Sequence, residues 1–167
     1  GTASAFISAG NTGAVVACAW SLLHRLPGVR RPGIAVTFQS VKGPTTILDV
    51  GANVHCKPLH LFQYGVMADV LSRDVLGVQN PRIGLLNIGE EEKKGNELVR
   101  QTREYFERST LNFVGNVEGN DLWSGRCDVI VCEGFVGNVV LKVSEGLGGF
   151  LRATVRENLS QSASANS

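Results

Sequence analysis

Short apolar, β-branched runs bounded by glycine, asparagine or aspartate alternate along this chain with longer segments of helical periodicity. Six runs predict strands, at residues 5–8, 34–38, 46–50, 82–87, 111–115 and 128–133. Four segments predict helices, at residues 12–25, 58–76, 95–108 and 136–156. This alternation is typical of α/β proteins with a largely parallel sheet. The pattern therefore predicts one α/β domain over residues 1–158, followed by a disordered polar tail over 159–167.

Local signals refine this arrangement. The strands at 34–38 and 46–50 are joined by too few residues for a parallel crossover, so we expect an antiparallel pair within a mixed, mostly parallel sheet. Pro58 stands where a helix can lose an N–H group without penalty, and Gly77 follows the same helix as a stop signal.

Composition excludes several classes of protein. The 167 residues carry a net charge of +1 with 19% charged side chains, which argues against a nucleic-acid-binding protein. The four cysteines lie mostly in apolar segments and indicate reduced, buried thiols in a cytoplasmic protein. Residues 1–23 carry no charge, but the "SAGNTG" at their centre is typical of neither a membrane helix nor a signal peptide.

Asparagines beside glycines follow nearly every predicted strand, at the sheet edge where open α/β proteins bind ligands. An amide group binds oxygens without carrying charge, glycine lets backbone N–H groups approach, and helix N-termini add positive potential. These loops therefore predict an anion site, for phosphate or a thioester carbonyl. Any single Gly–Asn pair is ordinary turn or capping chemistry, and only the set favours function. The candidates, in chain order, are Asn11, Thr12, Asn53, Lys57, Asn87, Lys94, Asn96, Asn116, Gly137 and Asn138.

The word "FVGNV" occurs twice, at residues 113–117 and 135–139, without the surrounding similarity that a solenoid repeat would need. We expect the first copy to end a strand and the second to open a helix, so that Asn116 and Asn138 reach the same sheet edge. The acids Glu90–Glu92 are expected to be solvated side chains at a helix start.

Other chemistries are disfavoured by spacing. His55, Cys56 and His60 match no standard zinc ligand set, so no metal is expected. The chain has no G-x-S-x-G nucleophile motif and no G-x-G-x-x-G dinucleotide fingerprint, so neither a serine mechanism nor a nucleotide cofactor is expected.

The chain closely resembles the bacterial PlsX family of phosphate acyltransferases over residues 3–151. The likeness rests on five segments in the family's order and spacing, "AFISAGNTGA", "DVGANVHCKP", "NPRIGLLNIGEEEKKGNEL", "NFVGNVEGND" and "DVIVCEGFVGNVVLK". Family members begin with a further strand and end with more α/β structure, so the resemblance is to the central part of the family domain. Lys93 stands where the family usually has glycine.

The resemblance implies an isopropylmalate/isocitrate-dehydrogenase-like fold, incomplete at both ends, and a homodimeric enzyme without a cofactor. It implies transfer of a fatty acyl group from acyl carrier protein to inorganic phosphate. The acyl phosphate would pass to a membrane glycerol-3-phosphate acyltransferase for phospholipid synthesis, from a cytoplasmic enzyme with peripheral membrane association. Within the matching motifs, Lys94 would bind and orient phosphate and Asn138 would stabilise the oxyanion. The remaining candidates would bind substrate.

Two other functions stay open at the level of sequence. One is a phosphotransacetylase-like transfer between acyl coenzyme A and phosphate, and the other is a truncated, non-catalytic domain that binds phosphate or a partner. Because acyl carrier proteins are acidic, Arg25, Arg30 and Arg31 are candidates for a docking face, although a solvated basic loop would look the same.

Overall fold

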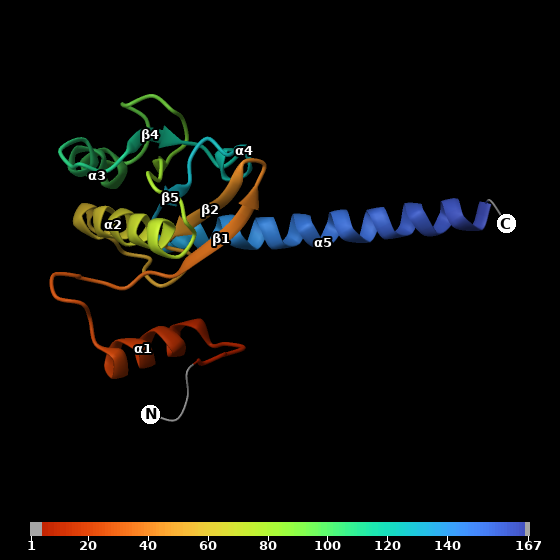
Figure 1. Cartoon of the computed structure of the whole chain (residues 1–167), viewed down its shortest axis with the longest axis horizontal. Coiled ribbons are helices and arrows are strands. Elements are labelled where there is room, and N and C mark those ends of the chain that lie inside the picture. Colours follow the sequence, from red (N-terminus) through yellow and green to blue (C-terminus); the bar gives the residue numbers. More distant parts are fainter. Residues whose placement is uncertain (1–4, 166–167) are drawn as a thin grey trace.

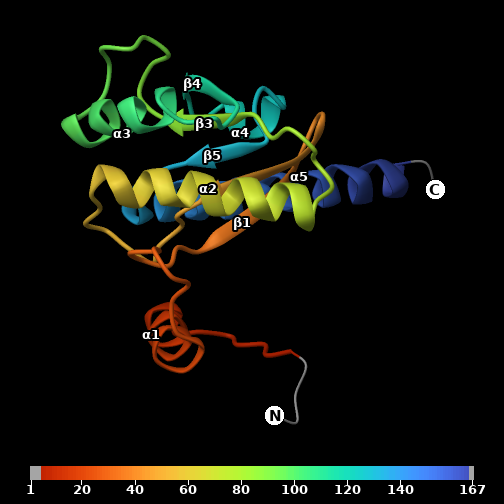
Figure 2. The same ribbon diagram turned by 60° about the vertical axis from the view of Figure 1, so that its left-hand side comes forward.

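The computed structural model describes residues 5–165 and contains a five-stranded sheet with helices on both faces (Figures 1 and 2). The strands lie in the order β1-β2-β5-β3-β4, with β1 antiparallel to β2 and the other neighbours parallel. This confirms the predicted mixed α/β fold and its antiparallel pair. The elements are α1 (Thr12–Leu23), β1 (Ala35–Ser40), β2 (Gly43–Leu48), α2 (Pro58–Asp74), β3 (Ile83–Leu86), α3 (Glu97–Glu107), β4 (Phe113–Val117), α4 (Asp121–Ser124), β5 (Val129–Val131) and α5 (Gly134–Ala165).

The two faces of the sheet carry separate hydrophobic clusters. Because side chains alternate along a strand, Val129 and Val131 of β5 enter one cluster and Ile130 enters the other. The first cluster lies under α2 and α3 and includes the fully buried Tyr64 and Phe106. The second lies on the α4 and α5 side (Figure 2). The central strands are thus buried on both faces, as is usual for parallel sheets.

The amino ends of β3 and β5 are tied together by Arg82 and Asp128. The Arg82 guanidinium donates to Asp128 in a fork, from Nε at 3.0 Å and from Nη2 at 2.9 Å, and the Arg82 backbone N–H donates at 2.8 Å. Burial alone would raise the pKa of Asp128, but the hydrogen bonds from Arg82 outweigh it and lower that pKa below its usual value. This pair therefore sets the register of the two strands at the edge opposite the predicted site.

The predicted strand at residues 5–8 is wrong. This segment is extended but has no strand partner within the described residues, and Phe6 and Ile7 are 82% and 95% exposed. A strand needs a neighbour to satisfy its backbone groups, and an apolar, β-branched pattern does not supply one. Helix α1, which follows it, buries none of its residues and lies apart from the sheet in both views (Figures 1 and 2).

The chain end also differs from the prediction. Helix α5 continues to Ala165, so residues 159–165 are helical where disorder was expected, while residues 166 and 167 lie outside the described residues. This serine- and alanine-rich stretch contains no glycine or proline, and extending an existing helix is far easier than nucleating one. Figure 1 shows α5 running out well beyond the sheet. Among the described residues, no helix is both long and apolar enough to cross a membrane.

The contact between α2 and α3 depends on the absence of a side chain at Gly65. A Cβ atom there would lie 2.5 Å from two ring carbons of Phe106, which is fully buried. We expect Gly65→Ala to lower the free energy of unfolding by about 1–3 kcal/mol through overpacking, measured by urea denaturation. Gly119→Ala is the control, since a Cβ there meets nothing within 4 Å. Equal stability of the two variants would contradict this account of the helix contact.

Candidate active site

Most of the predicted site residues meet at one edge of the sheet. The four parallel strands end together, so the loops that follow β2, β3, β4 and β5 share their carboxyl edge. These loops and the helix starts they lead into carry Asn53, Lys57, Asn87, Lys94, Asn96, Asn116, Gly137 and Asn138. Asn11 and Thr12 do not join them. Asn11 instead caps the separate helix α1, where its side chain accepts from the Ala14 N–H at 3.3 Å.

A buried carboxylate organises the β2–α2 side of this edge. Asp49 is fully buried and accepts from the backbone N–H groups of Ile34 (3.0 Å), Ala52 (3.0 Å) and Asn53 (2.8 Å). The Asn53 amide adds a donor to Asp49 at 3.2 Å and another to the Pro32 carbonyl at 2.6 Å. Asn53 therefore uses its side chain within the loop in this structure.

The backbone N–H groups at the start of α5 are capped by a carboxylate of the chain itself. The Glu133 carboxylate accepts from the N–H groups of Phe135 at 2.7 Å and Val136 at 2.9 Å, and the Gly134 N–H donates to the Asn53 carbonyl at 2.8 Å. The helix begins at Gly134, two residues earlier than predicted, so the second "FVGNV" is already helical. The groups that would have received a phosphate at this helix end are therefore occupied by protein.

Gly137 and Asn138 lie directly against the Asp49 loop. Gly137 is buried, and a Cβ atom there would run into the carbonyl oxygen of Asp49 and lie 2.9 Å from Cys132 Sγ. Asn138 is exposed, and its Cβ lies 3.6 Å from the point where a side chain on Gly51 would begin. Gly51 has a φ of +126°, which favours glycine, so the backbone passes close to the Asn138 amide.

Lys94 lies on the loop between β3 and α3. Its backbone N–H donates to the Glu91 carbonyl at 3.1 Å, and its own carbonyl accepts from the Asn87 amide at 3.0 Å. Asn116 donates to the same Glu91 carbonyl from the end of β4, at 2.9 Å. Asn96 caps α3 by accepting from the Val99 N–H at 3.0 Å. The lysine side chain itself is exposed.

The acids Glu90–Glu92 are exposed, as predicted, but they do not lie at a helix start, because α3 begins only at Glu97. Residues 88–95 form an irregular loop before α3, where Glu90 pairs with Arg126 and Glu92 pairs with Arg103 at 2.9 Å. Arg103 lies on α3, 11 positions from Glu92, and Arg126 follows α4, 36 positions from Glu90, so the local charge pattern does not indicate either pair. The ion pairs neutralise two acids that would otherwise repel an anion near Lys94.

A cavity of about 300 Å³ lies between the starts of α3 and α5. Its floor is apolar and includes Leu61, Leu86 and Val99, while Asn87, Asn96 and Glu133 line it with polar groups. Lys94 and Asn138 are not among its lining residues, but Gly95 and Val136 beside them are. The arrangement can hold an apolar group with a polar end toward the carboxyl edge of the sheet.

Burial shifts the pKa values of three titratable groups near this edge. Burial raises the pKa of the Cys132 and Cys56 thiols, which keeps both protonated at neutral pH. Burial, with the nearby Arg31 and Lys57, lowers the pKa of His60, whose neutral Nδ1 accepts from the Lys57 N–H at 3.1 Å. The described residues contain no group of three or more histidine, cysteine or acidic side chains able to hold a metal ion.

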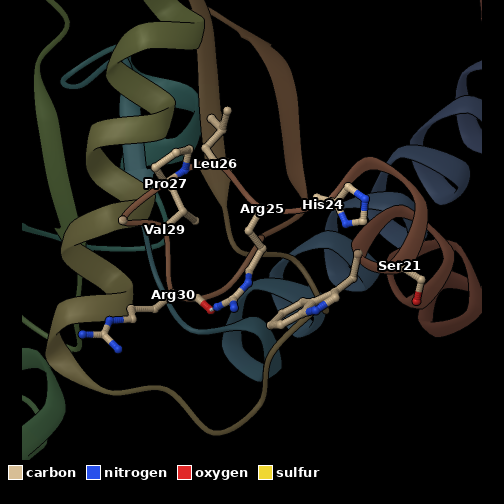
Figure 3. Close-up of a pocket in the computed structure, with 9 residues that line it drawn as sticks. Ser21, His24, Arg25, Leu26, Pro27, Val29 and Arg30 are labelled. Atoms are coloured by element: carbon tan, nitrogen blue, oxygen red, sulfur yellow. Dashed lines mark hydrogen bonds between the residues drawn. The ribbon is translucent and has the colours of Figure 1, made fainter.

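A second cavity, of about 620 Å³, lies between the end of α1 and the loop at residues 25–30 (Figure 3). There Arg25 stacks over the Trp20 ring at 4.8 Å and donates to the Arg30 carbonyl at 3.0 Å. Figure 3 shows the Arg30 side chain pointing away from Arg25. Gln63 of α2 joins this loop to the sheet layer, accepting from the Arg30 N–H at 2.8 Å and donating to the Gly28 carbonyl at 2.7 Å.

Two carboxylates that shape the edge, Asp49 and Glu133, were not among the residues predicted from the sequence. Asp49 directly follows the buried end of β2, and an acid at that point signals a residue that receives backbone donors. Glu133 precedes Gly134 at the start of a helix, where an acid is a recognised capping signal.

The fold is of the α/β type seen in a phosphotransacetylase. The EutD phosphotransacetylase from Staphylococcus aureus superposes with a TM-score of 0.60 over 78% of this chain and 46% of its own, at 17% identity. That identity supports the fold alone.

The chain belongs to the fatty acid synthesis protein family, whose model matches residues 1–166. It is 54% identical over 160 residues to the phosphate acyltransferase of Nitratidesulfovibrio vulgaris strain DP4, covering 95% of this chain and 46% of that protein. It is 53% identical over 163 residues to the phosphate acyltransferase of Polynucleobacter necessarius, covering 97% of this chain and 48% of that protein. The chain thus spans about half the length of the curated relatives it matches.

The close approach at Gly137 gives a test of how the α5 start is held. We expect Gly137→Ala to destabilise the protein by about 1–3 kcal/mol or more, because the new methyl group collides with a backbone carbonyl. Gly146→Ala, in the same helix and with nothing within 4 Å of its Cβ, should instead stabilise by up to about 1 kcal/mol. Urea unfolding of both variants decides, and a neutral Gly137→Ala would show that the loop can move away.

Proposed function

We propose that the protein to which this chain belongs transfers a fatty acyl group from acyl carrier protein to inorganic phosphate, giving an acyl phosphate for phospholipid synthesis. Relatives that are 53% and 54% identical to this chain are named phosphate acyltransferase, and the family name points to fatty acid synthesis. The structural observation that carries the proposal is Lys94. It is an exposed cation beside the start of α3, with no carboxylate partner within residues 5–165, while Glu90 and Glu92 are neutralised by arginines.

Phosphate binds beside Lys94 and the first turn of α3, rather than at α5, whose first amides Glu133 occupies. A phosphate oxygen forms a bond to the thioester carbonyl carbon, and the tetrahedral oxyanion is stabilised by the Asn138 amide. The carbon–sulfur bond then breaks, and the thiolate of the carrier protein leaves and takes up a proton. The apolar floor of the neighbouring cavity suits the acyl group.

The proposal also covers the remaining predicted site residues, the oligomeric state and the location of the enzyme. Asn53, Lys57, Asn87, Asn96, Asn116 and Gly137 are proposed either to contact the substrate or to support the loops around it, whereas Asn11 and Thr12 lie at the start of the separate helix α1 and are not included. A homodimer is supported by exposed apolar side chains on α5, among them Phe150 and Leu159. A cytoplasmic enzyme that associates with the membrane surface would pass its product to a glycerol-3-phosphate acyltransferase.

Lys94→Ala tests the phosphate assignment. In the longest reading frame that contains this chain, we expect kcat/KM for phosphate to fall about 100- to 1,000-fold, because a cation near the developing charge is lost. The measurement is phosphate-dependent loss of the acyl-carrier-protein thioester. Lys142→Ala removes an exposed lysine that pairs with Glu145 on α5 and should leave the rate unchanged.

Three outcomes separate the candidate functions. Unchanged kinetics in Lys94→Ala would remove that residue from the site. Faster turnover of a coenzyme A thioester than of the carrier-protein thioester would instead favour the phosphotransacetylase-like activity. Saturable phosphate binding without loss of either thioester would favour a non-catalytic domain.

The basic segment at residues 25–31 is proposed to dock the acidic carrier protein. Arg30 lines the cavity of Figure 3 and Arg31 follows it in the chain, and neither side chain has a carboxylate partner in the described part of the chain. We expect the double reversal Arg30→Glu and Arg31→Glu to raise the KM for acyl carrier protein about 10-fold, with kcat nearly unchanged. Arg108→Glu, at an exposed position at the end of α3, is the control. A KM that does not respond would exclude this docking face.

A further inference from the structure

The peptide that carries Lys94 is held on both sides by asparagine side chains from neighbouring strands. The Lys94 carbonyl accepts from the Asn87 amide at 3.0 Å. The Lys94 N–H donates at 3.1 Å to the Glu91 carbonyl, which is itself held by Asn116 at 2.9 Å. Asn87 directly follows β3 and Asn116 lies within β4, and the two strands pair in parallel. Asn87 therefore holds the loop at Lys94 directly, and Asn116 holds it through the Glu91 carbonyl that the Lys94 N–H contacts.

Asn116 is an unexpected residue for its position. It is only 2% exposed, and its Oδ1 has no hydrogen-bond partner among the described residues, so one of its polar atoms is buried without compensation. An aliphatic side chain of similar size would avoid that penalty. The group that an aliphatic residue cannot replace is the Nδ2 donor, and its one acceptor among residues 5–165 is the Glu91 carbonyl.

Asn87 is held equally closely. Its Oδ1 accepts from the Ile88 N–H at 2.9 Å, so both ends of its amide are used. Gly95, directly after Lys94, has a φ of +91°, and a Cβ there would run into the Asn87 amide. Glycine at 95 thus allows the approach of Asn87 to the Lys94 carbonyl.

We propose that Asn116 and Asn87 are positioning residues that hold the backbone of Lys94 for phosphate binding, a role that rests on the proposed function of this edge. The position of a lysine ammonium group depends on its four side-chain torsions and on the position of its backbone, and holding the backbone removes the second source of variation. The two asparagines act through Lys94 and need no contact with substrate. The ion pairs of Glu90 and Glu92 hold the outer parts of the same loop.

The first test is amide hydrogen exchange, which does not depend on activity. In the full chain, we expect Asn116→Ala and Asn87→Ala each to speed exchange of the Lys94 N–H roughly 2- to 10-fold, because one supporting hydrogen bond is lost. Asn112→Ala is the matched control, since this asparagine also donates to a backbone carbonyl, that of Asn80 at 3.2 Å, but before β4 at the opposite edge. It should leave Lys94 exchange unchanged.

The second test is a double-mutant cycle on phosphate affinity, measured as the phosphate dependence of thermal unfolding so that no turnover is needed. We expect Asn116→Ala to weaken phosphate binding about 3- to 10-fold when Lys94 is present and to have no effect in the Lys94→Ala background. If Asn116→Ala does not fold, the half-buried Asn87→Ala takes its place in the cycle.

The outcomes separate the two proposals. Lys94 exchange that stays slow in both asparagine variants, or an equal loss of phosphate affinity with and without Lys94, overturns the positioning role even if Lys94→Ala is inactive. Intact phosphate transfer by Lys94→Ala overturns the assignment of Lys94 in the proposed function, and the exchange data then still report whether the asparagines hold the loop.

Discussion

The buried carboxylate of Asp49 is the contact on which much of the carboxyl edge depends. Its oxygens receive four N–H donors, and these come from the segment before β1 and from the loop before α2. The backbone carbonyl of the same residue accepts from Cys132 Sγ at 3.4 Å and touches the position where Gly137 has no side chain. One residue thus sets the spacing between β1, the β2–α2 loop and the start of α5. A buried charge is stable only when its hydrogen bonds are complete, so these segments must fold together.

The other half of the edge is built on amides and ion pairs instead. The β3–α3 loop receives a donor from the end of each of two strands, and two of its acids are matched by arginines from α3 and from the segment after α4. Exposed ion pairs contribute little stability individually, so their main effect here is on the shape and net charge of the loop. One half of the edge is thus fixed by a buried acid and the other by neutral amides, and Lys94 lies exposed on the second half, beside α3.

The hydrophobic pattern was sufficient for five of the six predicted strands, because a sheet buried on both faces leaves continuous apolar runs. It failed at residues 5–8, where the composition suits a strand but no neighbour is present in the described chain. For the site, eight of the ten predicted residues lie at one edge of the sheet, as expected from their positions at or after strand ends. Which groups those residues contact could not be predicted, because the partners of Glu90, Glu92 and Asn116 lie 36, 11 and 25 positions away in the chain.

The starts of α3 and α5, which flank the cavity lined by Leu61 and Val99, differ in charge because of Glu133. The Glu133 carboxylate is attached to the chain beside the α5 amides that it accepts from, which gives it a high effective concentration there. The start of α3 is capped by the neutral amide of Asn96 and carries no resident charge on its cap. An anion in the cavity between these helix starts would meet the Glu133 carboxylate at the α5 side, whereas the acid in the first turn of α3, Glu97, is paired with Arg100. Under the proposed function, the negative group of a substrate is therefore expected to lie toward α3.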